Sequence, residues 1–156
     1  MADPQQFGPN GFTTTRVFDA PRERVWREWT EPEPFADWFG GVECEIPLHT
    51  VAMDVRPGGT WRATMFCGPR RREIRWRGEY LEVAAPERLV FTITDLPDDE
   101  DTYDLVIVVL VALDETRTEM HFEQRGHMRP DEYERAKQGW GTFFARMAER
   151  LARRAA

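Results

Sequence analysis

Residues 130–154 read PDEYERAKQGWGTFFARMAERLARR, and this stretch decides the fold of the chain. Its large apolar side chains recur at helical spacing, and they are Trp140, Phe143, Phe144, Met147 and Leu151. Residues three or four positions apart lie on one face of a helix, so the stretch predicts an amphipathic helix with a single apolar stripe. Acidic residues fill its first turns and arginines its last, which suits the helix dipole. Such a helix has to lie on an apolar surface.

Residues 42–125 supply that surface, because their hydrophobic period changes to two. Trp61, Ala63 and Met65 alternate with polar side chains, for example, and Pro57-Gly58-Gly59 just before them is a strong turn signal. A period of two predicts strands that bury one face. The strands expected along the chain are 13–18, 51–55, 61–67, 74–83, 89–94, 103–113 and 116–125.

Two short helices are expected after the first strand. Pro21 suits the first position of a helix, and Pro32 ends that helix and leads into a second one over 33–38. Residues 1–11, rich in Pro, Gly and Gln, are expected to form a flexible arm, and 12–156 a single domain. The sequence therefore predicts an α+β domain in which about six or seven antiparallel strands curve around one long C-terminal helix.

Composition excludes several classes of protein. The net charge of −7 argues against a protein that neutralises nucleic-acid phosphates. The longest apolar run, 105–113, is too short to span a bilayer, so we expect no membrane insertion. No secretory signal is visible in residues 1–12, and Cys44 and Cys67 show no disulfide framework. A cytoplasmic protein with two free thiols is the expectation from these features.

Four phrases of the sequence resemble a known family. They are FDAPRERVWREWTEPEPFADWFGG (18–41), DVRPGGTWR (54–62), GEYLEVAAPERLVFT (78–92) and GWGTFFARMAERL (139–151). In this order they are similar to the START-like (SRPBCC) superfamily and, within it, to the stress-linked family named for the activator of heat-shock protein 90 ATPase homologue. The resemblance implies the helix-grip fold, with a deep cavity between the curved sheet and the C-terminal helix. Apolar or amphipathic small molecules often occupy such a cavity.

Aromatic residues are the main candidates for the walls of that cavity. Tryptophan is bulky and its N–H needs a partner, so packed cores use it sparingly, whereas ligand cavities with apolar walls use it often. Ordinary core packing is the competing interpretation for each residue taken singly. The residues expected to contact a ligand are Trp38, Trp61, Met65, Trp76, Tyr80, Glu82, Phe91, Phe122, Trp140 and Phe144.

Two of these candidates are polar. Tyr80 and Glu82 share strand parity with Trp76, so both are expected to face the cavity and orient a ligand. The competing interpretation is a solvated strand end at which Glu82 pairs with a nearby arginine. His127, before the last helix, is expected at the cavity rim rather than as a general base.

We therefore expect a small-molecule binding protein. The first alternative is an enzyme of the cyclase or hydratase type that uses Glu82, Tyr80 or His127 in the same cavity. The second, a partner of a chaperone, rests on the family name alone and is not expected. Neither metal nor cofactor is expected, because Cys44, His49 and Cys67 do not complete four zinc ligands.

Two further patterns predict how the sheet and the helix are covered. Residues 103–113 are apolar on both faces in their later half, so the N-terminal arm or a second subunit of a homodimer should cover the convex side. Gly139 and Gly141 flank Trp140 inside the last helix, where each costs about 1 kcal/mol relative to alanine. They serve either close packing against a strand or a helix that shifts to admit a ligand.

Overall fold

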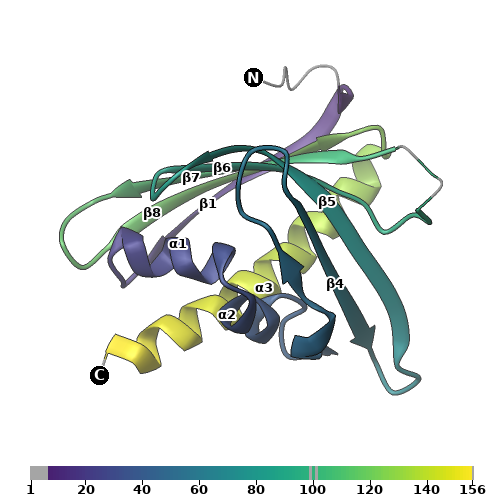
Figure 1. Cartoon of the computed structure of the whole chain (residues 1–156). Helices are drawn as coiled ribbons and strands as arrows, with labels where there is room; N and C mark the ends of the chain where they lie inside the picture. The colour runs from purple at the N-terminus through teal and green to yellow at the C-terminus, as the bar shows by residue number, and fades with distance from the viewer. Residues whose placement is uncertain (1–6, 99, 101, 156) are drawn as a thin grey trace.

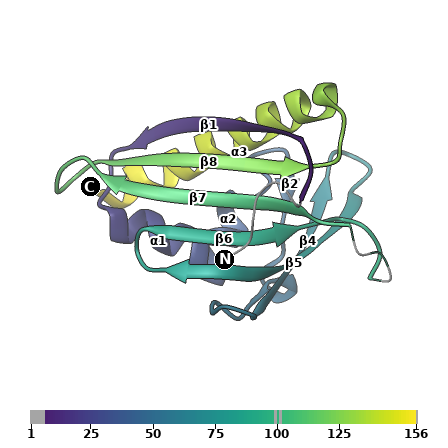
Figure 2. The same ribbon diagram turned by 90° about the horizontal axis from the view of Figure 1, so that it is seen from above.

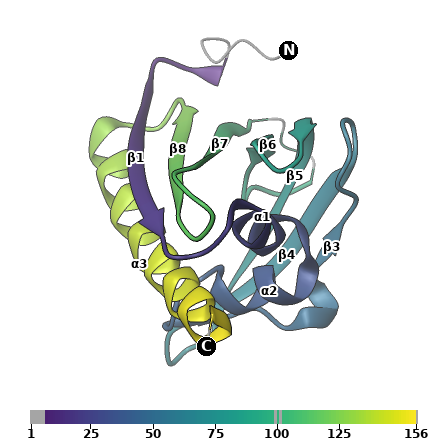
Figure 3. The same cartoon turned by 90° about the vertical axis from the view of Figure 1, so that its left-hand side faces the viewer.

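A long C-terminal helix, α3 (Pro130–Ala155), crosses the concave side of an antiparallel sheet (Figure 1). The structure is a computed structural model that describes residues 7–98, 100 and 102–155. Two short helices, α1 (Arg22–Thr30) and α2 (Pro32–Trp38), follow the first strand and lie on the same side of the sheet as α3 (Figures 1 and 3). The helix expected over 130–154 is confirmed.

The sheet has eight strands in the order β1-β8-β7-β6-β5-β4-β2, and β3 also pairs with β4. Viewed from above, β1, β8, β7, β6 and β5 lie side by side over the helices (Figure 2). All described pairings are antiparallel, as hairpin connections require. The strands are β1 (Asn10–Phe18), β2 (Cys44–Glu45), β3 (Ala52–Met53), β4 (Thr60–Cys67), β5 (Arg72–Ala84), β6 (Arg88–Ile93), β7 (Asp104–Ala112) and β8 (Thr118–Gly126).

The main differences from expectation lie near the N-terminus and after α2. Strand β1 begins at Asn10 rather than at residue 13, so part of the expected arm belongs to the sheet. Residues 1–6 of that arm lie outside the described residues. The two-residue strand β2 and the 3-10 helix η2 (Leu48–Thr50) were not predicted, because segments this short leave no periodic pattern.

Strand β7 is buried on both faces from Leu105 to Val108, but not in its later half, where we expected this, because Val111 is 41% exposed. Val106 and Val108 belong to the main core on the concave side. Leu105 and Ile107 belong to a second cluster on the other side, and Phe7 packs against that cluster. Within the described residues, the start of the chain therefore covers part of the convex side, which is one of the two covers expected.

Cys44 and Cys67 form a disulfide, so the expectation of two free thiols is wrong. The two residues stand directly opposite each other where β2 pairs with β4, with their Cα atoms 4.2 Å apart. That separation is slightly shorter than the usual range for bridged cysteines. The bridge joins the edge strand β2 to the body of the sheet.

Among the residues that the structure describes, none of the helices combines the length and the apolar character needed to cross a membrane.

Candidate functional site

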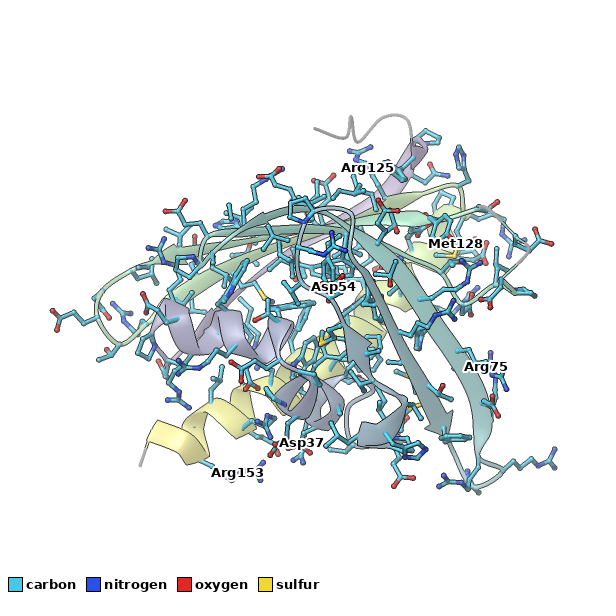
Figure 4. All side chains as sticks on the ribbon, viewed as in Figure 1. Asp37, Asp54, Arg75, Arg125, Met128 and Arg153 are labelled. Carbon is cyan, nitrogen blue, oxygen red and sulfur yellow. A yellow bond between two sulfur atoms is a disulfide. The ribbon has the colours of Figure 1, made fainter. Side chains whose placement is uncertain are left out.

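A cavity of about 390 Å³ lies between the first half of α3 and the neighbouring ends of the sheet strands. This volume falls within the range of small-molecule sites. Met128, between β8 and α3, marks this end of the molecule in Figure 4. The apolar side chains and glycine that line the cavity are Phe39, Trp76, Ile93, Leu96, Met128, Ala136, Gly139, Trp140 and Phe143, and the polar residues are Thr94, Asp95, Thr102, Asp104 and Gln124.

The glycine in the cavity wall leaves space that a side chain would fill. A Cβ atom added to Gly139 would meet nothing within 4 Å. The same holds for Gly141, which does not line the cavity. The close-packing explanation for these two glycines is therefore wrong. Gly139 instead contributes open volume beside Trp140.

Four side chains from three elements form a hydrogen-bonded network at the inner wall. Gln124 of β8 donates Nε2–H to Oδ2 of Asp104 at 2.8 Å, and Tyr133 of α3 donates its hydroxyl to the same oxygen at 2.9 Å. Trp140 donates its indole N–H to Oε1 of Gln124 at 2.8 Å. The network fixes the side-chain amide of Gln124 between a donor and an acceptor, and it joins α3 to the sheet.

Asp104 of β7 is the half-buried charged group of this network. Burial raises its pKa above the usual 3.8, and the hydrogen bonds from Gln124 and Tyr133 only partly offset that effect. Oδ2 takes both hydrogen bonds, and Oδ1 accepts none from the described residues. Gly126 allows this arrangement, since a Cβ atom there would lie 1.9 Å from Oδ1 of Asp104 and 2.3 Å from the hydroxyl of Tyr133.

Arg77 of β5 holds the rim of the cavity in place. Its guanidinium donates to the backbone carbonyls of Leu96 at 3.3 Å, Pro97 at 2.7 Å and Glu100 at 2.8 Å. It also donates to the hydroxyl of Tyr103 and is only 9% exposed. Because Leu96 is part of the cavity wall, Arg77 helps to hold the rim in position, together with the hydrogen bond from the amide of Leu96 to the hydroxyl of Thr94.

Of the residues expected to contact a ligand, Trp76 and Trp140 line the cavity. Trp140 lines the cavity and also belongs to the hydrophobic core, because it is only 6% exposed and its ring centroid lies 4.7 Å from that of Phe122. Trp38 and Trp61 are core residues whose indole N–H groups donate to backbone carbonyls. The other buried candidates that do not line this cavity are Met65, Tyr80, Phe91, Phe122 and Phe144.

Three of the expected residues surround a second, much smaller space. Trp61, Tyr80 and Phe91 line a volume of about 10 Å³, which holds one water molecule at most. Tyr80 is buried there, and burial raises the pKa of its hydroxyl. Side chains therefore fill the part of the core that these residues occupy.

Glu82 does not face the cavity, so its expected placement beside Tyr80 is wrong. A β-bulge lies between them, because Tyr80 pairs with Phe91 whereas Glu82 pairs with Val90. The extra residue moves Glu82 to the face of Val90, which belongs to the convex cluster. Glu82 there forms an ion pair with Arg88 at 3.0 Å, as the competing interpretation held. His127 is exposed and does not line the cavity either.

The sequence analysis missed Asp104, Gln124 and Tyr133 of the polar network, and it also missed wall residues such as Phe39 and Phe143. Gln124 did carry a signal, because it shares strand parity with the buried Met120 and Phe122. A polar residue on the apolar face of a strand needs a buried partner. Within the described part of the chain, no group of three or more potential metal ligands comes together.

Comparisons with known proteins agree with this architecture. The family model described as "Activator of Hsp90 ATPase homolog 1-like protein" matches residues 19–152. A crystal structure of a Chromobacterium violaceum protein is similar at 25% identity and a TM-score of 0.78, over 92% of this chain and 98% of that one. The AHSA1 protein of Silicibacter pomeroyi is similar at 18% identity and a TM-score of 0.80, over 92% of this chain and 98% of that one. No curated protein matches the chain. The expected helix-grip fold is confirmed.

Proposed function

The chain belongs to the family of Activator of Hsp90 ATPase homologue 1-like proteins, and from this membership and the site geometry we propose that it binds an apolar or amphipathic small molecule. The ligand lies in the cavity between the first half of α3 and the sheet. The observation that carries the proposal is the cavity of about 390 Å³ with largely apolar walls. The chaperone activation in the family's description is an activity of the protein so named, whereas the support in this chain comes from its cavity.

The composition of the walls supports a ligand of mixed character. Trp76, Trp140 and Phe143 offer broad apolar surfaces. The amide of Gln124 and the carboxyl of Asp104 supply polar groups at one end. Sites for small molecules combine apolar walls with a few polar groups that orient the ligand.

Gly139 provides the sharpest test of this proposal. A leucine at this position projects into the cavity, and its Cβ atom has no other atom within 4 Å. We expect Gly139→Leu to weaken the binding of the neutral apolar probe naphthylethanol at least about tenfold, because the side chain takes the volume that the probe needs. Isothermal titration calorimetry measures the affinity, and circular dichroism checks the fold.

Gly141→Leu is the matched control. It places the same side chain two positions further along α3, where a Cβ atom is equally unobstructed and no cavity is lined. This control is expected to bind naphthylethanol like the wild type. Equal affinities in both variants, or no binding to the wild type, would contradict the proposal.

A catalytic alternative of the cyclase or hydratase type would depend on Asp104 rather than on Glu82 or Tyr80. Its carboxyl lines the cavity, and burial raises its pKa toward the range in which an acid–base group works. Turnover that is lost in Asp104→Asn while ligand affinity is kept would favour this alternative.

A further inference from the structure

The cavity carries negative charge without a positive counterpart. Asp95 and Asp104 line it, and no arginine or lysine stands among the described residues that line it. Arg77 is nearby, but its guanidinium is engaged by the carbonyls of the rim, by Tyr103 and by Asp98. The electrostatic field inside the cavity therefore favours a cation over an anion.

Asp104 has an unused acceptor at the inner wall. Both donors that reach it, Gln124 and Tyr133, are neutral and share Oδ2. Its other oxygen, Oδ1, accepts no hydrogen bond within the described part of the chain, and no ion pair of Asp104 is formed there. The charge of His127 lowers the pKa of Asp104, but the two side chains form no ion pair within the described part of the chain, and His127 does not line the cavity. A half-buried carboxylate without an ion-pair partner is costly, and a ligand that donates a charge-assisted hydrogen bond would reduce that cost.

Aromatic rings form much of the remaining wall. Trp76, Trp140, Phe39 and Phe143 all line the cavity. The face of an aromatic ring attracts a cation, and an indole does so most strongly. The same rings offer an apolar surface for the hydrocarbon part of a ligand, so one wall serves both parts of an amphipathic cation.

From these three features we infer that the ligand is a lipophilic amine, an aromatic or other apolar molecule with one protonated amino group. The ammonium group donates to Oδ1 of Asp104, and the apolar part lies against Trp76 and Trp140. This inference rests on the proposed binding function and adds the charge of the ligand to it.

Three probes of one shape test the inference, namely naphthylethylamine, naphthylethanol and naphthylacetate. At neutral pH and low salt, calorimetry is expected to give an affinity for the amine at least about tenfold above that for the alcohol, with the anionic acetate weakest. Asp104→Asn is expected to lower the ratio of the amine affinity to the alcohol affinity to about one. Asp114→Asn, which changes the charge at a distant turn, is expected to keep the wild-type ratio.

The outcomes separate this inference from the proposed function. If the alcohol binds as tightly as the amine, the ligand is not selected by charge, and the binding function stands without the amine. If none of the probes binds, the proposed function itself fails. A preference for the amine that persists in Asp104→Asn overturns the role of this carboxylate. Where that variant fails to fold, the order of the three affinities for the wild type decides, and an acetate that binds as tightly as the amine overturns the inference.

Discussion

Arg150 of α3 donates to the carboxylate of Glu28 in α1, with Nε 2.9 Å from Oε1, although the residues stand 122 positions apart. Arg150 also contacts Asp37 of α2, to which Arg146 donates at 3.1 Å. Burial alone would raise the pKa of Asp37, but hydrogen bonds and charges from the two arginines bring it below the usual value. Asp37 lies beside the second half of α3 in Figure 4, so the ion pairs fix the half of the helix that does not line the cavity.

Loss of this ion pair should destabilise the fold strongly. Arg150→Met leaves Glu28, which is 3% exposed, buried without its cation. We expect the free energy of unfolding to fall by about 3 kcal/mol, measured by urea denaturation. Arg146→Met is the control, because Asp37 is more exposed, and it should cost less than about 1 kcal/mol. Equal losses of unfolding free energy in the two variants would contradict the greater importance of the buried ion pair.

Gly126→Ala should disrupt the polar network of the cavity. The added methyl group would lie 1.9 Å from Oδ1 of Asp104 and 2.3 Å from the hydroxyl of Tyr133. We expect a loss of about 1–3 kcal/mol in stability together with weaker probe binding. Gly141→Ala adds a methyl group with no neighbouring atom within 4 Å, so this variant should instead raise stability by about 1 kcal/mol. Thermal denaturation of both variants checks the opposite signs.

Arg77→Lys should release the cavity rim. A lysine keeps the charge but cannot hold three carbonyls in the planar geometry of a guanidinium. We expect stability to fall by about 2 kcal/mol and the amides of the rim to exchange faster with solvent. Arg75→Lys on the same strand, whose exposed side chain points away from the body in Figure 4, serves as the control. Unchanged hydrogen exchange in Arg77→Lys would show that the rim does not depend on this anchor.

The stability contribution of Asp104 should vary with pH. Because burial raises its pKa, the folded state holds the proton more tightly than the unfolded state does. The charged carboxyl therefore destabilises the fold above the raised pKa, and this cost disappears as the pH falls toward 3.8. We expect Asp104→Asn to be more stable than the wild type at neutral pH and to lose that advantage near pH 3.8.

Asp114→Asn should change the stability at neutral pH in the opposite direction to Asp104→Asn. A hydrogen bond from the backbone of Thr116, with others from the side chains of Arg117 and Thr116, lowers the pKa of Asp114. Its charged form therefore stabilises the fold above 3.8, and the variant should be less stable than the wild type at neutral pH. Urea denaturation across the pH range compares the two variants, and parallel curves would contradict both assignments.

Reduction of the disulfide should destabilise the chain through the loop that it closes. Cys44 and Cys67 are separated by 23 positions, and a cross-link over such a loop contributes about 3 kcal/mol. We expect a reducing agent to lower the free energy of unfolding by that amount. The double variant Cys44→Ala/Cys67→Ala should match the reduced protein and should not respond to the agent. A response in the double variant would point to a different cause.

Long periodic segments were predicted well because their pattern is local. The stripe from Trp140 to Leu151 requires a helix with one buried face, and α3 follows it. The apolar alternation around Trp61 likewise predicted β4. Features without periodicity were missed, and the two-residue strand that holds Cys44 opposite Cys67 is the clearest of them.

The candidate site was predicted only in part, because its polar members depend on register. Trp76 and Trp140 were identified from size and parity. Glu82 was misplaced because a bulge of one residue reverses parity, and nothing in the sequence marks that bulge. Asp104 and Gln124 meet across neighbouring strands, and such a contact follows from strand pairing rather than from spacing along the chain.

The anchoring of the rim by Arg77 has a consequence for how this protein can diversify. Arg77 contacts the loop mainly through the backbone carbonyls of Leu96, Pro97 and Glu100, groups that every amino acid carries. The path of the loop therefore depends on few of its side chains, among them Thr94, which accepts from the amide of Leu96, and Asp98, which pairs with Arg77. Substitutions at Asp95 or Leu96 can change what the entrance admits without moving the entrance itself, so the fold separates the evolution of ligand preference from the maintenance of shape.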